Sequence, residues 1–268
     1  MPKIQTLRGM NDIGPTEAKE WSQVELTLQS ILESYGYEEI RFPIVEKTEL
    51  FTRSNEAADI VTKEMYTFED KSGESISLRP EGTAGCVRAA IDNDLLRTDK
   101  PRLWYSGPMF RYERPQKGRS RQFHQFSAEV FGLNTPAVDV ELITASASFW
   151  KAFGIYEDVT LEINNLGDDR ARSNYVKELV DFLNGKLDDI DDDSRRKLKE
   201  NPLRILDSKS KKIQEILNEA PIIEDFVTQS SKDYHNELLS MLDELNIAYE
   251  VNSKLVRGLD YYNQTVFE

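Results

Sequence analysis

The chain has 268 residues, of which 39% are hydrophobic and 10% aromatic, so it can bury a full core and exceeds the usual size of one simple domain. No stretch approaches the roughly 20 apolar residues that span a bilayer, residues 1–11 lack the features of a secretory signal, and we expect a cytoplasmic protein without membrane contact. The formal net charge of −14 argues against a protein that coats nucleic acid through bulk positive charge, and a single cysteine with two histidines makes a structural metal site unexpected.

The N-terminal part of the chain predicts one long helix followed by extended segments. Pro15 suits the first turn of a helix, apolar residues recur at helical spacing over residues 21–35, and Gly36 suits the position just past the end. An extended segment then runs from residue 37 to Pro43. Strand-like residues 65–69 and 75–78 enclose a turn, which predicts a hairpin that leads through residues 79–83 into a short helix.

Two segments rich in aromatic and apolar residues, 103–111 and 122–131, predict a pair of antiparallel strands joined by a charged loop. The two-residue period of the second strand separates two sets: Phe126, Ala128 and Val130 point one way, and Gln125, Ser127 and Glu129 the other. A strand that carries Gln125 and Glu129 is either half exposed to water or forms the floor of a polar pocket.

The loop between these strands is the local exception to the acidic composition. Its basic residues are Arg111, Arg114, Lys117, Arg119 and Arg121, and they face only Glu113, a net charge of +5 − 1 = +4 in eleven residues. Such a loop predicts an anion-binding site, and a solvated hairpin tip is the alternative.

Residues 166–250 change in character to lysine, aspartate, leucine and asparagine at helical spacing, which predicts a separate helical insertion. We expect its acidic run, residues 188–193, to be a solvated loop without function. After residue 248 the chain becomes strand-like again, and residues 255–262 stand out by their density of polar and aromatic side chains.

The histidines and the cysteine each favour a structural role. Strand parity turns His124 toward the apolar face, which predicts a packed core histidine and not a catalytic base. His235 falls in the helical insertion and is expected at the surface, and Cys86 is expected to be a small buried helix residue.

Four stretches in this order resemble the histidyl-tRNA synthetase family. They are residues 7–12 (LRGMND), residues 78–83 (LRPEGT), residues 110–116 (FRYERPQ) together with 121–125 (RQFHQ), and residues 255–262 (LVRGLDYY). The resemblance implies an α+β fold, the class II aminoacyl-tRNA synthetase catalytic core, in which helices flank an antiparallel sheet and a helical domain is inserted. The implied domains are a core with the first two class II motifs at residues 1–165, the insertion at 166–250, and a return to the core at 251–268.

The resemblance also implies a histidine–tRNA ligase that uses ATP with Mg²⁺. Histidine and ATP form histidyl-adenylate and pyrophosphate, and the histidyl group then passes to tRNA(His). The implied protein is a homodimer whose interface includes the first helix and the strand ending near Pro43. The family's third motif and anticodon-binding domain are expected beyond residue 268, so residues 1–268 alone are expected to be inactive as a ligase.

The resemblance assigns roles to individual side chains. Those implied for histidine are Glu81, Thr83, Arg111, Gln125, Glu129, Arg257, Tyr261 and Tyr262; those implied for ATP are Arg111, Glu113, Arg119 and Arg257; those implied for the tRNA acceptor end are Arg114, Gln116 and Lys117. Arg111 and Arg257 are the implied catalytic pair, since a guanidinium offers a planar fork of donors to phosphate or carboxylate.

Within the histidine set, the carboxylate of Glu81 with two neutral hydrogen-bonding groups, Thr83 and Gln125, suits an ammonium. Glu129 and Tyr262 match the positions that read the imidazole, whose two nitrogens need complementary partners. By residue type alone, Gln125 and Glu129 equally fit an exposed sheet face, and Tyr261 and Tyr262 fit ordinary core aromatics.

Two rival functions remain open. A synthetase-like regulatory subunit of ATP phosphoribosyltransferase would keep the fold and bind histidine, but it is expected to lose arginines that serve ATP; the retention of Arg111 and Arg257 argues for the enzyme. A non-catalytic RNA- or nucleotide-binding module would need only the basic loop, and it would have no use for the acid and amide at Glu129 and Gln125.

Overall fold

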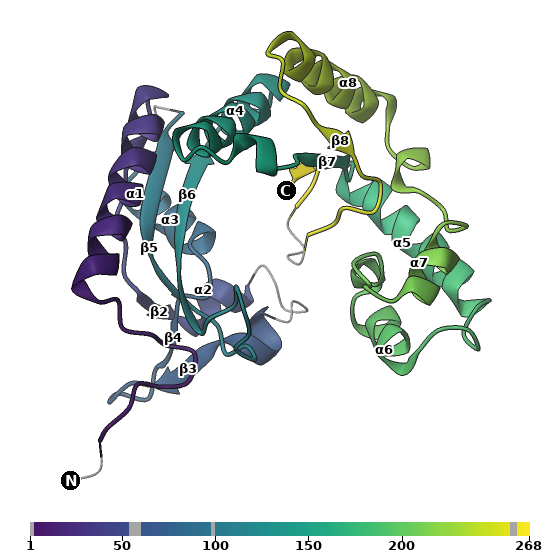
Figure 1. Ribbon diagram of the computed structural model, residues 1–268. Coiled ribbons are helices and arrows are strands. Elements are labelled where there is room, and N and C mark those ends of the chain that lie inside the picture. The colour runs from purple at the N-terminus through teal and green to yellow at the C-terminus, as the bar shows by residue number, and fades with distance from the viewer. Residues whose placement is uncertain (1–2, 54–59, 98–99, 258–261) are drawn as a thin grey trace. The chain divides into compact units, whose positions relative to one another are not determined.

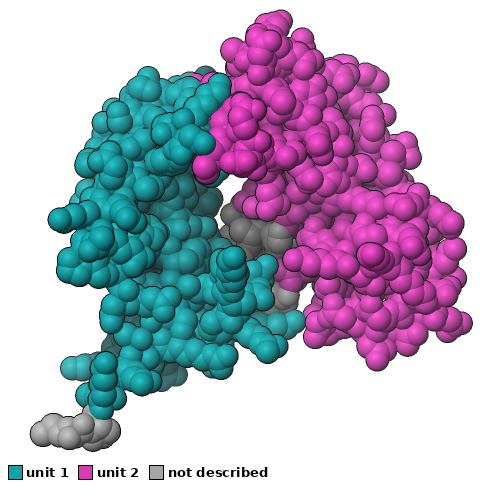
Figure 2. Space-filling model, in the orientation of Figure 1, with its two compact units in different colours: residues 1–134, 145–154 teal, residues 135–144, 155–268 magenta. Residues whose placement is uncertain are grey.

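The computed structural model describes residues 3–53, 60–97, 100–257 and 262–268, and the chain divides into two compact units. Unit 1 comprises residues 1–134 and 145–154, and unit 2 comprises residues 135–144 and 155–268; Figure 2 colours them separately. These boundaries differ from the expected ones after residues 165 and 250, and that three-part division stays a prediction.

Unit 1 begins with the predicted long helix. Its helices are α1 (Pro15–Ser34), α2 (Thr48–Thr52), α3 (Thr83–Asp92) and the second half of α4 (Pro136–Ala152), with a π-helical turn at Ile60–Glu64; its strands are β1 (Glu38–Glu39), β2 (Val45–Lys47), β3 (Tyr66–Glu69), β4 (Ser75–Leu78), β5 (Arg102–Phe110) and β6 (Gln122–Val130) (Figure 1). Pro15 opens α1 and Gly36, with φ of +81°, follows its end, as predicted.

Two three-stranded sheets form in unit 1, in the orders β1-β5-β6 and β2-β4-β3. The predicted long strand pair is confirmed: β5 and β6 are antiparallel in a continuous register from Arg102 opposite Val130 to Phe110 opposite Gln122. The predicted hairpin is β3 with β4. β1, however, runs parallel to β5, so the sheet is mixed and not wholly antiparallel. No hairpin joins β1 to β5, and the long intervening chain allows either direction.

One face of the β5–β6 pair carries an aromatic layer beneath α1 and the second half of α4. Trp104 stacks on Phe126 at 5.0 Å between ring centroids, and Phe126 meets Phe149 of α4 edge to face at 6.3 Å. His124 lies 4.8 Å from Trp21 of α1. The parity argument for His124 is therefore confirmed, and it packs among aromatic rings.

The opposite face of the same strands packs against α3. Cys86 and Ala90 of that helix are fully buried and join Leu103, Tyr105 and Met109 of β5 in one cluster. Cys86 is thus the small buried helix residue that was predicted. Because helices lie against both faces of the pair, the polar residues of β6 that point toward α3 are only partly exposed.

Unit 2 combines a small sheet with a helical array. It holds the first half of α4, a 3-10 turn at Tyr156–Asp158, β7 (Glu162–Asn165), α5 (Asp169–Asn184), α6 (Asp192–Glu200), a 3-10 turn at Pro202–Ile205, α7 (Lys211–Leu217), a 3-10 turn at Ile223–Asp225, α8 (Gln229–Glu244), β8 (Glu250–Val251) and β9 (Thr265–Phe267). β7 pairs in parallel with β8 and antiparallel with β9. The predicted helices over residues 166–250 and the return to a strand are confirmed.

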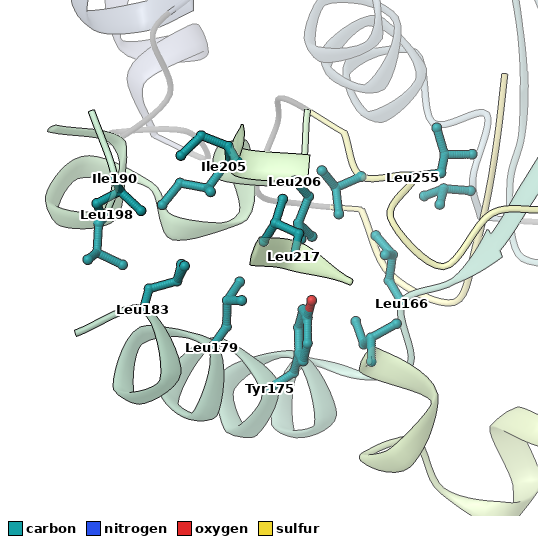
Figure 3. Packing of buried hydrophobic residues seen from close by; sticks show 14 residues of the cluster. Leu166, Tyr175, Leu179, Leu183, Ile190, Leu198, Ile205, Leu206, Leu217 and Leu255 are labelled. Atoms are coloured by element: carbon teal, nitrogen blue, oxygen red, sulfur yellow. The ribbon is translucent and has the colours of Figure 1, made fainter. Parts of the chain in front are cut away.

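The core of unit 2 is built on one face of α5. Tyr175, Leu179 and Leu183 recur every fourth residue, are fully buried, and point together toward Leu206 and Leu217 (Figure 3). A second cluster joins α4 and α8 to β7, and its members include Val140, Ile143, Ile163, Leu238 and Leu242. Within the described residues, no helix is long and apolar enough to cross a membrane.

Two expectations for the helical region need correction. Part of the acidic run starts a helix: the side chain of Asp191 accepts the N–H of Ser194 at 2.8 Å at the N-terminus of α6, and this bond lowers the pKa of Asp191. His235 is half-buried, with a buried Nδ1 that has no hydrogen-bond partner among the described residues, so it is not a simple surface residue. Burial lowers the pKa of His235.

Gly167 precedes α5 with φ of +64°, and a Cβ there would lie 2.7 Å from Val227 and 2.9 Å from Ala171. Gly36 has φ of +81° but open space around it. Both Gly→Ala changes incur backbone strain of about 1–2 kcal/mol, and only Gly167→Ala adds an overpacking cost of about 1–3 kcal/mol. Calorimetric unfolding should therefore show a larger fall in transition temperature for Gly167→Ala, and equal falls would contradict this packing.

Candidate functional site

Two acids, the buried Glu81 and the half-buried Glu129, meet at the start of α3. Glu81 accepts the backbone N–H of Thr83 at 2.5 Å and that of Ala84 at 3.1 Å, so both of its carboxylate oxygens face the N-terminus of the helix. The hydroxyl of Thr83 donates to Glu129 of β6 at 2.8 Å. The hydroxyl of Tyr105, on β5, donates to the same oxygen at 3.1 Å. The structure thus brings Glu81, Thr83 and Glu129 together, and their roles toward histidine stay a prediction.

The electrostatics of this pair are set mainly by burial. Loss of water raises the pKa of Glu129, and nearby Glu81 raises it further, while the hydrogen bonds from Thr83 and Tyr105 oppose the shift. Burial also raises the pKa of Glu81, against the backbone N–H groups of α3 and the charge of Arg111. Two carboxylates that are costly to ionise beside hydrogen-bond donors favour a cationic ligand.

Cys86 lies on α3 close to the same acids and does not act as a nucleophile there. Burial, with the negative charges of Glu129 and Glu81, raises the pKa of the Cys86 thiol to about 12. The thiolate is the reactive form, and it is negligibly populated near neutral pH.

Tyr105 is a member of the site that the sequence analysis missed. Its ring packs so closely over Gly82 that a Cβ at that position would fall inside the ring's contact distance, at 2.1 Å. Only glycine therefore allows Tyr105 to reach Glu129. Tyr105 and Glu129 follow the same strand alternation, but the register that makes them diagonal neighbours, with Tyr105 opposite Ser127, is not readable from either strand alone.

Arg111 and Gln125 lie at the other end of the β5–β6 pair. The Nε of Arg111 donates to the carbonyl of Pro80 at 2.8 Å, and its guanidinium lies 5.0 Å from the Phe123 ring centroid. These contacts anchor the side chain, and its two terminal nitrogens make no hydrogen bond to any described residue. Gln125 stands opposite Gly107, and the guanidinium of Arg79 occupies the space where a Cβ of Gly107 would lie.

The basic loop is held at its base and exposed at its tip. Arg121 donates its backbone N–H to Gly9 at 2.7 Å and places its guanidinium 3.8 Å from the Tyr112 ring centroid. Glu113 and Arg119, both implied for ATP, pair with each other at 3.2 Å. At the tip, Arg114, Gln116 and Lys117 are exposed and make no side-chain bond to any described residue.

The remaining residues implied for the site belong to unit 2. Arg257 pairs with Glu268 at 3.1 Å, and its guanidinium lies 6.0 Å from the Tyr262 ring centroid. Tyr262 packs at the edge of the unit 2 core. Tyr261, with residues 258–260, lies outside the described residues.

The model of the histidyl-tRNA synthetase family matches residues 9–268. Among solved structures, the chain is similar to apo histidyl-tRNA synthetase from S. aureus, with a TM-score of 0.77 and 37% identity over 99% of this chain. It spans 61% of that protein's length.

Two more distant structures share the fold. One is described as an ATP phosphoribosyltransferase regulatory subunit/histidyl-tRNA synthetase from Bacillus halodurans C (TM-score 0.72, 21% identity, 100% of this chain and 73% of the other). The other is a histidine–tRNA ligase subunit from Alicyclobacillus acidocaldarius (TM-score 0.65, 19% identity, 100% and 85%).

The fold is therefore the expected α+β catalytic core of a class II synthetase, with helices around sheets that are largely antiparallel. Since the family model covers nearly all of the sequence, from residue 9 to residue 268, the chain belongs to the histidyl-tRNA synthetase family.

Proposed function

We propose that this protein is a histidine–tRNA ligase, which activates histidine with ATP and transfers it to tRNA(His). The observation that carries the proposal is the cluster of Glu81, Thr83 and Glu129, with Arg111 anchored on Pro80, the neighbour of Glu81 in the chain. Histidine carries an ammonium group, a carboxylate and a basic ring. The two acids suit the ammonium and the ring, and Arg111 suits the carboxylate. Family membership supplies the reaction type.

In this proposal the amino group of histidine binds Glu81, Thr83 and Gln125. Glu129 accepts a hydrogen bond from the imidazole, Tyr262 is assigned to the other edge of the ring, and Tyr261 is assigned to histidine binding, as the family resemblance implies. A buried carboxylate rejects apolar analogues of histidine because it would be left without its partner. The donors from Thr83 and Tyr105 hold Glu129 in one orientation, which prepares it for the ring.

Adenylate formation requires little covalent participation by the protein. The histidine carboxylate attacks the α-phosphate, pyrophosphate leaves, and the charge on the phosphate oxygens grows on the way. Arg111 and Arg257 donate hydrogen bonds to the phosphate oxygens through their planar guanidinium groups, and these bonds stabilise the growing negative charge. Arg111 is well prepared for this role, since its Nε bond to Pro80 fixes the side chain and leaves both terminal nitrogens for substrate.

ATP brings Mg²⁺, which neutralises phosphate charge when bound. Burial raises the pKa of Glu64, and the nearby charge of Glu113 raises it further, while Arg111 and Arg119 oppose the shift. One or two carboxylates beside phosphates suit Mg²⁺, so this pair fits an ion held mainly by the nucleotide. In the parts of the chain that the structure describes, no group of three or more metal-ligating side chains is present.

The exposed loop tip is proposed to bind the acceptor end of tRNA. Arg114, Gln116 and Lys117 are exposed, and neither cation is neutralised by an acid of the described chain. With a chain charge of −14, such a contact has to be local, and its affinity is expected to fall steeply as salt is added. The function also implies a cytoplasmic location.

The rival with specific support is a histidine-binding regulatory subunit, because a protein of 21% identity that shares the fold carries that description. It would bind histidine without forming an adenylate. The two functions therefore differ in one measurable step, the histidine-dependent exchange of pyrophosphate into ATP.

We expect the complete gene product to catalyse ATP–pyrophosphate exchange that depends on histidine. Arg257→Lys should keep histidine binding but slow exchange on the order of a hundredfold, because a point charge replaces a fork directed at the developing phosphate charge. Histidine binding without any exchange in the parent would favour the regulatory subunit, and an unchanged rate in Arg257→Lys would refute the role of that residue.

Glu129→Gln should weaken histidine binding by about 2–5 kcal/mol while ATP binding changes little, because a buried charged partner is lost. The same change should stabilise the ligand-free protein at neutral pH. The raised pKa of Glu129 means that ionisation is less favourable in the folded state, so its destabilising effect grows as pH rises above about 4.3, the ordinary value for glutamic acid.

Titration calorimetry with histidine and with ATP, and thermal unfolding at pH 7 and at pH 4, measure these effects. The stabilisation should shrink at the lower pH. The control is Glu178→Gln, an exposed residue of α5, which should change neither quantity. A histidine affinity within twofold of the parent would rule out Glu129 as the ring reader.

We further propose a homodimer that buries α1 and the segment around Pro43. Apolar side chains are exposed there, among them Leu26 at 60% and Ile44 at 40%. Leu26→Asp should weaken dimerisation at least about tenfold in sedimentation equilibrium. Leu245→Asp, at a leucine of unit 2 that is 51% exposed, is the control and should leave the dimer intact. A monomeric parent, or an unaffected Leu26→Asp, would contradict this interface.

A further inference from the structure

The end of β7 holds an asparagine whose side chain is fully engaged by backbone groups. Asn164 is 5% exposed, and its Nδ2 donates to the carbonyl of Leu255 at 2.9 Å and to that of Ser253 at 3.3 Å. Its Oδ1 accepts the N–H of Asn165 at 2.9 Å. The amide has two hydrogens and one oxygen, and each has a partner in the backbone. Asn164 therefore holds the chain two residues before Arg257.

A second side chain, from α5, holds the chain on the far side of Arg257. Nη1 of Arg172 donates to the carbonyl of Tyr262 at 2.8 Å. The side chain of Arg172 is only 21% exposed. It also forms a 3.4 Å ion pair with Asp169, an exposed residue one turn earlier. A charge-assisted bond from a guanidinium to a carbonyl is stronger than a neutral one, so Arg172 fixes the main chain at Tyr262.

The chain that follows Tyr262 is tied to the same scaffold. Gln264 donates its N–H to Gly167 at 2.8 Å, between β7 and α5, and its side-chain oxygen accepts the hydroxyl of Ser231 at 2.6 Å. Ser231, on α8, is 3% exposed, and its hydroxyl oxygen also lies 3.0 Å from the side-chain oxygen of Asn165. Residues of β7, α5, α8 and the connection between β7 and α5 thus hold the main chain before Arg257, at Tyr262 and at Gln264.

We infer that Asn164 and Arg172 are positioning residues for the activation of histidine, holding Arg257 and Tyr262 through the carbonyls of Leu255 and Tyr262. The inference rests on the proposed function. An apolar residue could fill the volume of Asn164 without needing three polar partners, so packing alone does not account for it. Such positioning residues affect the rate, because a displacement of about 1 Å in the groups that contact substrate can slow a reaction a hundredfold.

The test compares Arg172→Gln with Arg170→Gln in the complete gene product. Both arginines lie on α5, but Arg170 is exposed and makes no bond to any described residue. Hydrogen exchange followed by mass spectrometry should show exchange about tenfold faster in peptides covering residues 252–264 of Arg172→Gln, with α5 unchanged. In pyrophosphate exchange, its KM for histidine should rise and its kcat/KM fall by about ten- to a hundredfold.

A loss of folded protein would lower the apparent kcat without raising KM, so the change in KM separates positioning from a merely structural role. Arg172→Lys, which keeps a donor, should recover part of the loss. Asn164→Ser, with the exposed Asn174→Ser as its control, should reproduce the effect at the other anchor. Unchanged hydrogen exchange in Arg172→Gln, an equal effect of Arg170→Gln, or loosened residues 252–264 with normal kinetics would each overturn the inference. A parent without histidine-dependent exchange would refute the proposed function instead, while the hydrogen-exchange comparison still reports on the anchors.

Discussion

The register of β5 against β6 is the constraint on which the site in unit 1 depends. Because side chains alternate along a strand, the pairing decides which residues share a face with α3. It sets Tyr105 and Glu129 together beneath the start of that helix and sends His124 and Phe126 to the aromatic layer on the other side. A slip of β6 by one residue would turn Glu129 into that aromatic layer and remove the acidic pocket.

Glu81 and Glu129 are unfavourable to ionise when the site is empty, and a cationic ligand would make their ionisation more favourable. Glu81 and Glu129 are both buried enough for their pKa values to rise, and Glu81 adds to the shift of Glu129. Backbone N–H groups, Thr83 and Tyr105 compensate in part, and the positive charge of Arg111 lowers the pKa of Glu81. An ammonium or a protonated ring would add positive charge beside Glu129. A site that is unfavourable when empty and favourable when filled is a common compromise between stability and binding.

In unit 2, α5 and β7 hold the main chain close to Arg257 and Tyr262. The apolar face of α5, with Tyr175, Leu179 and Leu183, fixes that helix on its core and thereby places Arg172. β7 presents Asn164 from the other side. If Arg257 binds phosphate as proposed, its long side chain loses much conformational entropy, and a main chain already fixed nearby reduces the part of that loss that falls on the backbone.

Much of the architecture could be predicted from residue order alone. Pro15 and Gly36 delimit α1, the hairpin of β3 and β4 and the long pair of β5 and β6 follow local alternation, and periodicity separates the helices of residues 166–250. The resemblance to the family likewise singled out Arg111, Glu81 and Glu129, and the structure joins Glu81 and Glu129 through Thr83. These features depend on neighbours in the chain, which the sequence contains.

Contacts between distant segments were decided only by the tertiary structure. The parallel direction of β1, the entry of Tyr105 into the acidic pocket over Gly82, and the anchoring of residues near Arg257 by Asn164 and Arg172 each join parts of the chain far apart in sequence. The same holds for the buried Nδ1 of His235, which helical spacing alone did not separate from a surface position. Which side chains meet across such distances depends on register, helix rotation and packing volume, and these are properties of the folded chain and not of any one segment.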